Sequence, residues 1–238
     1  MIELDSALVT AYAPDPAGGA DRVVRLLGPV SLQLAERRIA IIGANGSGKS
    51  TLARLLNGLV LPASGTVRVD DLDTATDGRA VRRRVGFVFT SPDAQIVMPT
   101  PLEDVALSLR RLPLSADERD AAARCALARF GLAERAEVPA HALSGGQRQL
   151  LALASVLAAE PDVLVCDEPT TLLDLRWRTV VDDLLAGLDQ QVIVVTHDLE
   201  AAARADRVLV VDDGLVVFDG EPAPAVEHYR ALMAAVRA

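Results

Sequence analysis

The sequence is poor in several residue types, and each shortage excludes a class of protein. Of 238 residues, 24 are basic and 33 are acidic, and Lys49 is the single lysine. Only 3% are aromatic, so we do not expect a nucleic-acid surface of basic patches and stacking rings. The two cysteines are too few for a disulfide framework or a four-cysteine zinc site. No apolar run reaches the roughly 18 residues of a membrane span, and no secretory signal is visible, so we expect a cytosolic chain.

The residues that are abundant suit an α/β fold. Half of them are hydrophobic, enough for a sizeable core, and the length fits one large domain or two small ones. Short β-branched runs that are apolar throughout indicate strands covered by helices on both faces of a sheet. Leucines at helical spacing predict a helix from about Lys49 to Leu59. The expected strands cover residues 39–42, 66–69, 85–89, 163–166, 192–196 and 208–211.

The middle of the chain has a different pattern. Between about Ser91 and Glu160 no strong strand is visible, and Ser115 with Glu118 forms a capping box that begins a helix. We therefore expect an α/β core interrupted by a helical insertion. Cys125 and Cys166 are interpreted as small core residues on a helix and a strand. The predicted segments are a nucleotide-binding core (1–90 and 162–220), a helical subdomain (91–161) and a short C-terminal helix (221–238, mainly 225–236).

A phosphate-binding motif follows the first expected core strand. It fits G-x-x-x-x-G-K-[ST] between a strand and a helix. The glycines let consecutive backbone N–H groups point inward as an anion nest, and the helix dipole adds positive potential. We expect Lys49 to reach the β and γ phosphates of a nucleotide and Ser50 to hold Mg²⁺. The predicted P-loop consists of Gly43, Ala44, Asn45, Gly46, Ser47, Gly48, Lys49, Ser50 and Thr51.

A second cluster lies at the end of another apolar strand, where Asp167 and Glu168 follow residues 163–166. The carboxyl ends of parallel strands face the ligand in α/β sheets. We expect Asp167 to complete the Mg²⁺ shell and Glu168 to orient or deprotonate the attacking water. By itself, a strand that ends in two acids is most often ordinary surface sequence.

A third segment, Leu143 to Gln149, gives these acids their context. It reads Leu-Ser-Gly-Gly-Gln-Arg-Gln, with an N-capping serine and two glycines at a helix start, which is a second candidate phosphate site. Together with the P-loop, Asp167-Glu168-Pro169 and Thr196-His197-Asp198 in that order, it resembles the signature of ATP-binding cassette (ABC) ATPases. The resemblance covers about residues 12–220. It implies a RecA-like P-loop NTPase core with an antiparallel β subdomain and the helical insertion.

The resemblance also implies a head-to-tail dimer. In that dimer the P-loop of one subunit and Ser144, Gly145, Gly146 and Gln147 of the other hold ATP. Tyr12 resembles the aromatic residue that stacks on adenine, with a core or turn tyrosine as the alternative. His197 resembles the switch histidine at the γ-phosphate, and Asp174 the acid that communicates across the dimer.

One position departs from the family pattern. The family usually places a glutamine after the strand at 85–89, where it contacts Mg²⁺ and water, but this chain has Thr90. The hydroxyl can meet a metal-bound water but has a shorter reach, so we expect weaker hydrolysis or weaker coupling to the partner.

The segment Ser91-Pro92-Asp93-Ala94-Gln95-Ile96-Val97 resembles a short helix of energy-coupling factor (ECF) importers for vitamins and for cobalt or nickel, and the biotin-type members most of all. The alternative is a plain helix start capped by Asp93. The resemblance implies an ATP hydrolase coupled to transport, peripheral on the cytoplasmic face of the membrane. Its implied partners are a second ATPase subunit, identical or not, an integral membrane transport subunit and a substrate-binding membrane subunit.

Other functions remain open at this point. Another ABC importer or an exporter is the main alternative. A chromosome-maintenance or repair ATPase would carry a long coiled coil between P-loop and signature, and a translation-type cassette would carry two copies. The acidic balance and the missing aromatics also oppose these nucleic-acid functions.

Overall fold

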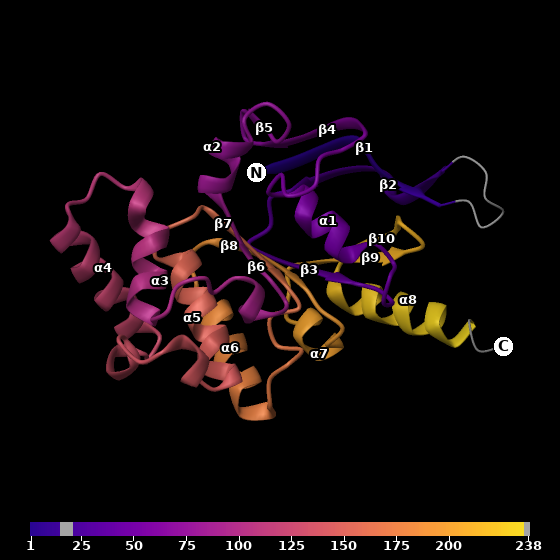
Figure 1. Cartoon of the computed structure of the whole chain (residues 1–238). Helices are drawn as coiled ribbons and strands as arrows, with labels where there is room; N and C mark the ends of the chain where they lie inside the picture. Colours follow the sequence, from indigo (N-terminus) through magenta and orange to yellow (C-terminus); the bar gives the residue numbers. More distant parts are fainter. Residues whose placement is uncertain (15–20, 236–238) are drawn as a thin grey trace. The chain divides into compact units, whose positions relative to one another are not determined.

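The computed structural model describes residues 1–14 and 21–235, which form two units. The first unit combines residues 1–85 with residues 191–238, and the second contains residues 86–190. The helices expected between residues 91 and 161 all lie in the second unit, which also includes two strands and one further helix. Figure 1 gives the elements of both units.

The first unit contains an antiparallel sheet with strand order β2-β1-β4-β5. Its strands are β1 (Ile2–Ala13), β2 (Arg22–Leu34), β4 (Ser64–Val69) and β5 (Leu72–Asp73). Ile2 pairs with Leu34 on one side and with Val69 on the other. Ile2 and Leu4 are buried while Asp5 is exposed, so one face of this sheet is apolar. This is the antiparallel β subdomain that the family resemblance implied.

The P-loop strand belongs to a second sheet, whose part within the first unit has the order β10-β9-β3-β8. These strands are β3 (Arg38–Ile42), β8 (Gln191–Val195), β9 (Arg207–Asp212) and β10 (Leu215–Gly220). β3 is parallel to both β8 and β9, whereas β9 and β10 form an antiparallel hairpin with Asp213 and Gly214 at its turn. The predicted strands are therefore present, and both neighbours of β3 come from the far end of the sequence.

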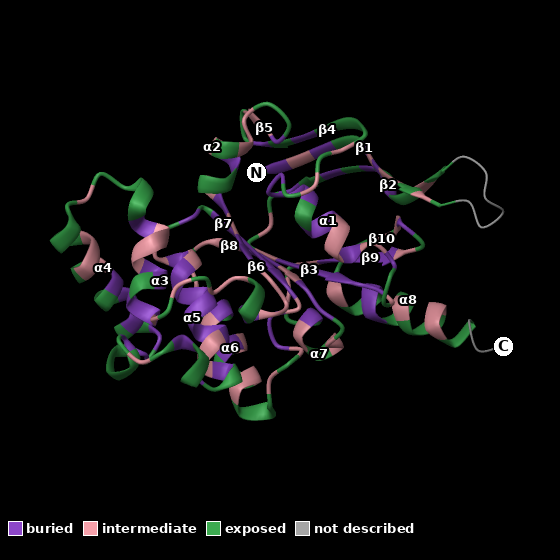
Figure 2. Ribbon diagram, viewed as in Figure 1, coloured by how far each residue is buried: buried purple, intermediate pink, exposed green. Residues whose placement is uncertain are grey.

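Helices pack on both sheets of the first unit. The first unit contains α1 (Lys49–Leu55), α2 (Gly78–Arg84), α7 (Leu199–Ala202) and α8 (Pro222–Ala235). α2 packs against β5, and α1, α7 and α8 pack against β8, β3 and the β9–β10 hairpin. α8 packs along β9 and β10, as Figure 1 shows. A core cluster joins β3, β9, α7 and α8, and Figure 2 shows buried residues along these strands. The cluster contains Ala40, Ile42, Ala202, Val208, Val210 and Ala225.

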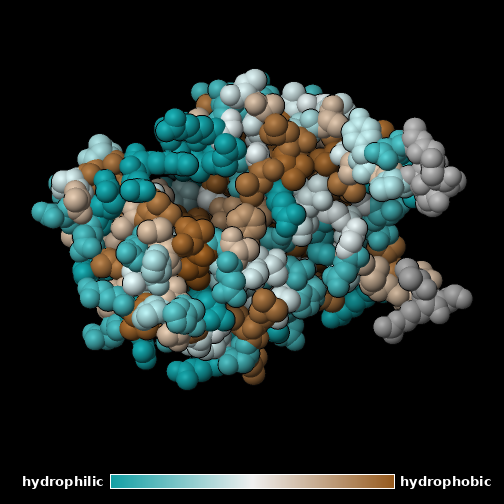
Figure 3. Space-filling model, viewed as in Figure 1, coloured by the Kyte–Doolittle hydropathy of each residue, from teal (hydrophilic) through white to brown (hydrophobic). Residues whose placement is uncertain are grey.

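The second unit is mainly helical. Its helices are α3 (Pro101–Ser108), α4 (Ala116–Arg129), α5 (Gly145–Leu157) and α6 (Leu175–Gly187), and its 3-10 turns are η1 (Pro92–Ala94), η2 (Leu109–Arg111), η3 (Ala133–Arg135) and η4 (Ala140–Ala142). Its strands β6 (Val85–Val88) and β7 (Val163–Asp167) are sheet neighbours. α3, α4 and α5 pack on one another. Hydrophilic residues predominate on the surface near α4 (Figure 3).

Helix termini follow the sequence signals closely. The capping box of Ser115 and Glu118 is formed at the start of α4, and Gly131 follows that helix with a left-handed φ of 69°. Two further capping boxes, at Thr100 and Ser144, begin α3 and α5. Capping chemistry therefore sets where the helices of the second unit begin.

Three expectations about element bounds were wrong by a few residues. α1 ends at Leu55 rather than near Leu59, because Gly58 adopts a φ of 69° and the Asn57 side chain accepts a hydrogen bond from the Leu59 amide. The strand expected to end at Phe89 ends at Val88. The C-terminal helix begins at Pro222 rather than Ala225, and its expected end at Val236 lies outside the described residues.

The cysteines differ from each other. Cys166 is buried in β7, as expected, and burial, together with the nearby Asp167 charge, raises the pKa of its thiol far above the usual range. Cys125 is exposed, so its placement in the core was wrong. The buried face of α4 is formed by Ala123, Ala126 and Leu127, and Cys125 points away from it.

Candidate functional site

The P-loop connects β3 to α1 and has the backbone shape of an anion nest. Gly43 adopts a φ of 155° and Gly48, the N-cap of α1, a φ of 107°. A Cβ atom at Gly43 would collide with the carbonyl oxygen of Val211 in β9. Glycine is therefore required at Gly43 both by the left-handed region and by close approach of a neighbouring strand.

Lys49 closes over this loop. Its side chain is 5% exposed, and Nζ donates hydrogen bonds to the carbonyl oxygens of Gly43 (2.9 Å) and Ala44 (2.8 Å). The ammonium group therefore lies beside the loop where a phosphate would approach the backbone N–H groups. A compact, strongly donating cation suits this place better than a planar guanidinium.

Ser47 supplies an observation that points to a ligand. Its side chain is 5% exposed, and its Oγ has no hydrogen-bond partner within the described parts of the chain. A buried hydroxyl without a partner costs free energy unless a ligand satisfies it. The loop therefore offers an orphan hydroxyl, a cation and glycine backbone at one place, which fits a polyphosphate.

The β9–β10 hairpin buttresses the same loop. The Gly214 amide donates to the Ser47 carbonyl (2.8 Å), and the Gly28 amide of β2 donates to the Gly214 carbonyl (2.6 Å). An Asp-Gly pair between two β-branched runs is typical of a hairpin turn, but it does not indicate that the turn holds the P-loop. No local signal could reveal this contact, because Ser47 and Gly214 are far apart in sequence.

Two further predicted residues of the first unit lie on β-strand ends. His197 is exposed and follows β8, which runs parallel to β3, and the Thr196 amide donates to the Ile41 carbonyl (3.0 Å). His197 therefore leaves the sheet at the edge from which the P-loop departs. Tyr12 lies near the end of β1 opposite Val23 and is 78% exposed, so its ring is available for stacking.

The acidic pair lies in the second unit. Asp167 ends β7 and is 1% exposed, and Glu168 follows with an unusual φ of 52°. The Thr171 hydroxyl donates to Oε2 of Glu168 at 2.8 Å. Thr90 follows β6, the strand beside β7, so the acids and Thr90 come at neighbouring strands. A left-handed conformation is uncommon at a non-glycine residue.

The signature segment begins α5. Ser144 is the N-cap: its Oγ accepts from the Gln147 amide (3.3 Å), and Oε1 of Gln147 accepts from the Ser144 amide (2.9 Å). Gly145 is exposed, whereas Gly146 is buried against the indole of Trp177. The helix N-terminus is thus built by a reciprocal cap and two glycines.

Asp174 is the N-cap of α6, and its Oδ1 accepts a hydrogen bond from the Trp177 amide at 2.9 Å. Two large apolar side chains flank it: Leu172 is 68% exposed and Leu175 is 77% exposed. These two side chains leave apolar area exposed at the start of α6.

The Gln95 segment is tied to the signature helix. Oε1 of Gln95 accepts from the Phe89 amide (3.2 Å), and Nε2 donates to the Ala152 carbonyl of α5 (3.3 Å). Asp93 forms an ion pair with Arg148 at 3.0 Å, without the angle of a hydrogen bond. The side chain that the motif singles out therefore points inward, while Val97, two residues on, is 67% exposed.

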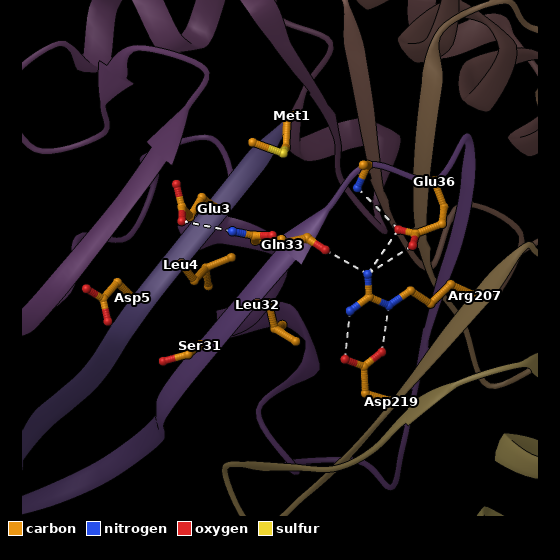
Figure 4. Close-up of a pocket in the computed structure, with 11 residues that line it drawn as sticks. Met1, Glu3, Leu4, Asp5, Ser31, Leu32, Gln33, Glu36, Arg207 and Asp219 are labelled. Carbon is orange, nitrogen blue, oxygen red and sulfur yellow. Dashed lines mark hydrogen bonds and ion pairs between the residues drawn. The ribbon is translucent and has the colours of Figure 1, made fainter.

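A separate open cavity of about 620 Å³ lies in the first unit, and none of its lining residues belongs to the P-loop (Figure 4). The Arg207 guanidinium points between Asp219, which it binds through two hydrogen bonds of 2.6 and 2.7 Å, and Glu36 (3.0 Å). The hydrogen bonds that Arg207 donates to Asp219, and then those to Glu36, raise the pKa of Arg207 above its usual range despite burial. These groups satisfy one another and link β9, β10 and the end of β2, so we interpret the cavity as structural.

Comparison with known proteins agrees with this geometry. A family model described as "ABC transporter" matches residues 27–171. The chain is 47% identical to a biotin transport ATP-binding protein, BioM, of Rhizobium etli (87% of this chain, 92% of the relative). It is 42% identical to an energy-coupling factor transporter ATP-binding protein, EcfA1, of Lactiplantibacillus plantarum (82% and 71%). Among solved structures it resembles a dimeric ATP-binding cassette, MJ0796, in a post-hydrolysis state bound to ADP and Pi, with TM-score 0.81 and 30% identity (93% and 99%).

Proposed function

This chain belongs to the ABC transporter family, and on that premise we propose that it powers a membrane importer by hydrolysing MgATP in a head-to-tail dimer. The observation that carries the proposal is the P-loop itself. It brings together a glycine nest, the buried Lys49 ammonium and the unpartnered Ser47 hydroxyl. In this proposal Gly43 to Thr51 bind the phosphates of ATP through backbone N–H groups and these side chains, and Tyr12 stacks on adenine.

We assign the residues of the hydrolytic step from the resemblance to the family. We assign Glu168 as the general base that orients and deprotonates water, and His197 as the contact to the γ-phosphate. Ser50 and Asp167 would hold Mg²⁺ through a hydroxyl and a carboxylate oxygen, the donors that this ion prefers, and the Thr90 hydroxyl would supply a further polar group beside it. When bound, Mg²⁺ neutralises the charge that develops on the phosphate oxygens. Lys49 stabilises the same charge from the P-loop side.

The proposed dimer explains the second helix N-terminus. Ser144, Gly145, Gly146 and Gln147 of one subunit face the nucleotide held by the P-loop of the other. Asp174 lies at the contact between subunits, and the exposed leucines beside it add apolar area. ATP then closes two subunits, and hydrolysis releases them.

We assign the transported solute by similarity. The BioM relative favours biotin, and the EcfA1 relative favours an energy-coupling factor importer, with a metal ion as the other cargo class. Among the described residues no helix is long and apolar enough to cross a bilayer. In the proposed importer this chain lies on the cytoplasmic face and acts with an integral transport subunit and a substrate-binding membrane subunit. The exposed Val97 is the proposed contact to the transport subunit.

The catalytic assignment is tested by Glu168→Gln. We expect this variant to bind ATP, to accumulate as an ATP-containing dimer in size-exclusion chromatography, and to lose at least about a hundredfold in turnover. Glu160→Gln, a change of the same chemistry outside the proposed site, is the matched control. Native turnover in Glu168→Gln would show that Glu168 is not the base.

The cargo assignment needs the membrane partners. Purification of the tagged chain from membranes should retain an integral subunit, and proteoliposomes of that complex should take up labelled biotin only with ATP inside the compartment that contains this chain. Uptake of a metal ion but not biotin would move the chain to the metal branch. Export, or uptake that depends on an extracellular binding protein, would move it to another class of ABC transporter.

A further inference from the structure

The indole of Trp177 lies against the signature glycines. A Cβ atom on Gly146 would overlap Cγ, Cδ1 and Cδ2 of the Trp177 ring, so the backbone of α5 and the indole are in direct contact. Gly146 is buried although its neighbours Ser144 and Gly145 are exposed. The side chain that buries it comes from α6, about thirty residues later in the chain.

The same tryptophan is also attached to Asp174. Its backbone amide donates to Oδ1 of Asp174 at 2.9 Å, which is the N-cap bond of α6. One residue thus contacts the signature through its ring and the Asp174 turn through its backbone. Both of these segments are exposed, and in the proposed dimer both face the other subunit.

We propose that Trp177 is a positioning residue that fixes the signature segment and the Asp174 turn in one geometry, ready to receive the nucleotide of the other subunit. This inference rests on the proposed dimer. Its physical basis is preorganisation: two exposed loops that are ordered before association lose less conformational entropy when the dimer forms. An indole suits the task because it is large and rigid and fills the space that the absent Cβ of Gly146 leaves.

The contact itself is tested by a double-mutant cycle on stability. Gly146→Ala should lower the urea midpoint of the otherwise native protein, because the new methyl group collides with the indole. In a Trp177→Ala background the same change should cost much less, since the obstacle is gone. Equal costs in both backgrounds would show that the ring does not restrict Gly146. Stability is the readout because Gly146 also belongs to the proposed ATP site.

The functional consequence is tested in the Glu168→Gln background, in which ATP-bound dimers accumulate. Trp177→Ala should raise the dimer dissociation constant roughly tenfold, with ATP affinity of the dilute monomer unchanged, because the P-loop lies in the other unit. Trp177→Phe should recover part of the loss. Val180→Ala, also on α6, is the matched control and should leave dimerisation as it was.

A spectroscopic readout separates positioning from general destabilisation. Trp177 is the single tryptophan of the chain, so its emission reports on the signature contact alone. In Glu168→Gln the emission should change along the same MgATP titration that drives dimerisation. Trp177 emission that stays constant while dimers form would overturn the inference. So would a dimer dissociation constant that Trp177→Ala leaves unchanged in the Glu168→Gln background. If Glu168→Gln with native Trp177 forms no ATP dimer, the proposed function itself fails.

Discussion

The Nζ atom of Lys49 lies 2.9 Å from the carbonyl oxygen of Gly43, the residue that begins the same loop. The chain otherwise uses arginine at every basic position, so a lysine has been kept only where a buried ammonium folds over glycine backbone. The planar, five-donor guanidinium is longer and cannot take that place without displacing the loop.

We predict that Lys49→Arg weakens ATP binding about a hundredfold or more, which is equivalent to about 2.7 kcal/mol or more of binding free energy. Fluorescent nucleotide titration measures this directly. Arg54→Lys, on the exposed side of the same helix, is the reciprocal control and should bind ATP as the native protein does. An arginine variant that binds normally would contradict the assignment of Lys49 to the phosphates.

We predict that Thr90→Gln raises basal ATP turnover roughly two- to tenfold. This corresponds to lowering the activation free energy by at most about 1.4 kcal/mol. The longer amide can reach the metal-bound water that a threonine hydroxyl reaches less well. Steady-state phosphate release is the measurement, with Thr90→Ala as the comparison that removes the hydroxyl. Unchanged turnover in Thr90→Gln would show that threonine at this position does not limit hydrolysis.

Asp104 is predicted to be a stability residue of the second unit. It is 4% exposed, and it accepts hydrogen bonds from the amides of Val97 (2.9 Å) and Met98 (3.1 Å) and from the Ser155 hydroxyl (2.8 Å). Asp104→Ala leaves these donors unpaired and should cost about 3 kcal/mol or more in unfolding free energy.

Urea denaturation measures that loss, and Ser155→Ala, which removes a single bond, should cost only about 1 kcal/mol. Because Asp104 accepts the hydrogen bond of the Val97 amide, Asp104→Ala should also weaken the proposed contact between Val97 and the transport subunit. Equal effects of the two variants would mean that the carboxylate does not organise the segment.

The carboxylate of Glu36 should make stability depend on acid pH. Burial alone would raise the pKa of Glu36, but hydrogen bonds from its own amide and from Arg207 outweigh it and hold that pKa below 4.5. A lowered folded-state pKa means that the stabilisation is complete above the unfolded value and is lost as the pH falls through the folded value.

Glu36→Gln should therefore flatten the fall of unfolding free energy below about pH 4.5. Solvent partly screens this pair, because the Arg207 side chain is 18% exposed and that of Glu36 is 36% exposed. We therefore expect a small change, visible as a slope rather than as a large loss at neutral pH. Urea midpoints at several pH values give the test. If the midpoints of the native protein and of Glu36→Gln fall in parallel with pH, the pKa of Glu36 is the same in the folded and unfolded states.

The motifs and the core strands could be predicted because they depend on local chemistry. Glycine spacing, capping boxes and β-branched runs act within a few residues, and they located the P-loop, α4 and β3 correctly. The resemblance to ABC ATPases is confirmed by the family match. Residue roles in catalysis stay predictions, because they concern ligands and a second subunit.

The remaining features depend on contacts between distant segments. No local pattern indicates that Gly214 holds Ser47, or that the indole of Trp177 covers Gly146. The residues next to Trp177 do not indicate which segment its ring covers, and the structure adds the contact with Gly146. The inward orientation of Gln95 is similar: the segment resembles a short helix of importer ATPases, but no local pattern indicates that the Gln95 amide bridges Phe89 and Ala152.

The strand that carries the P-loop has a consequence for how the protein is made. Both neighbours of β3 lie beyond residue 190, so β3 is synthesised long before anything exists to pair with it. Ribosomes need roughly 8 to 30 s for the approximately 150 residues between Ile42 and Gln191. During that time the apolar β3 segment lacks both of its partners. The nascent chain therefore cannot form the complete nucleotide-binding sheet around the P-loop until β8 and β9 have left the ribosome.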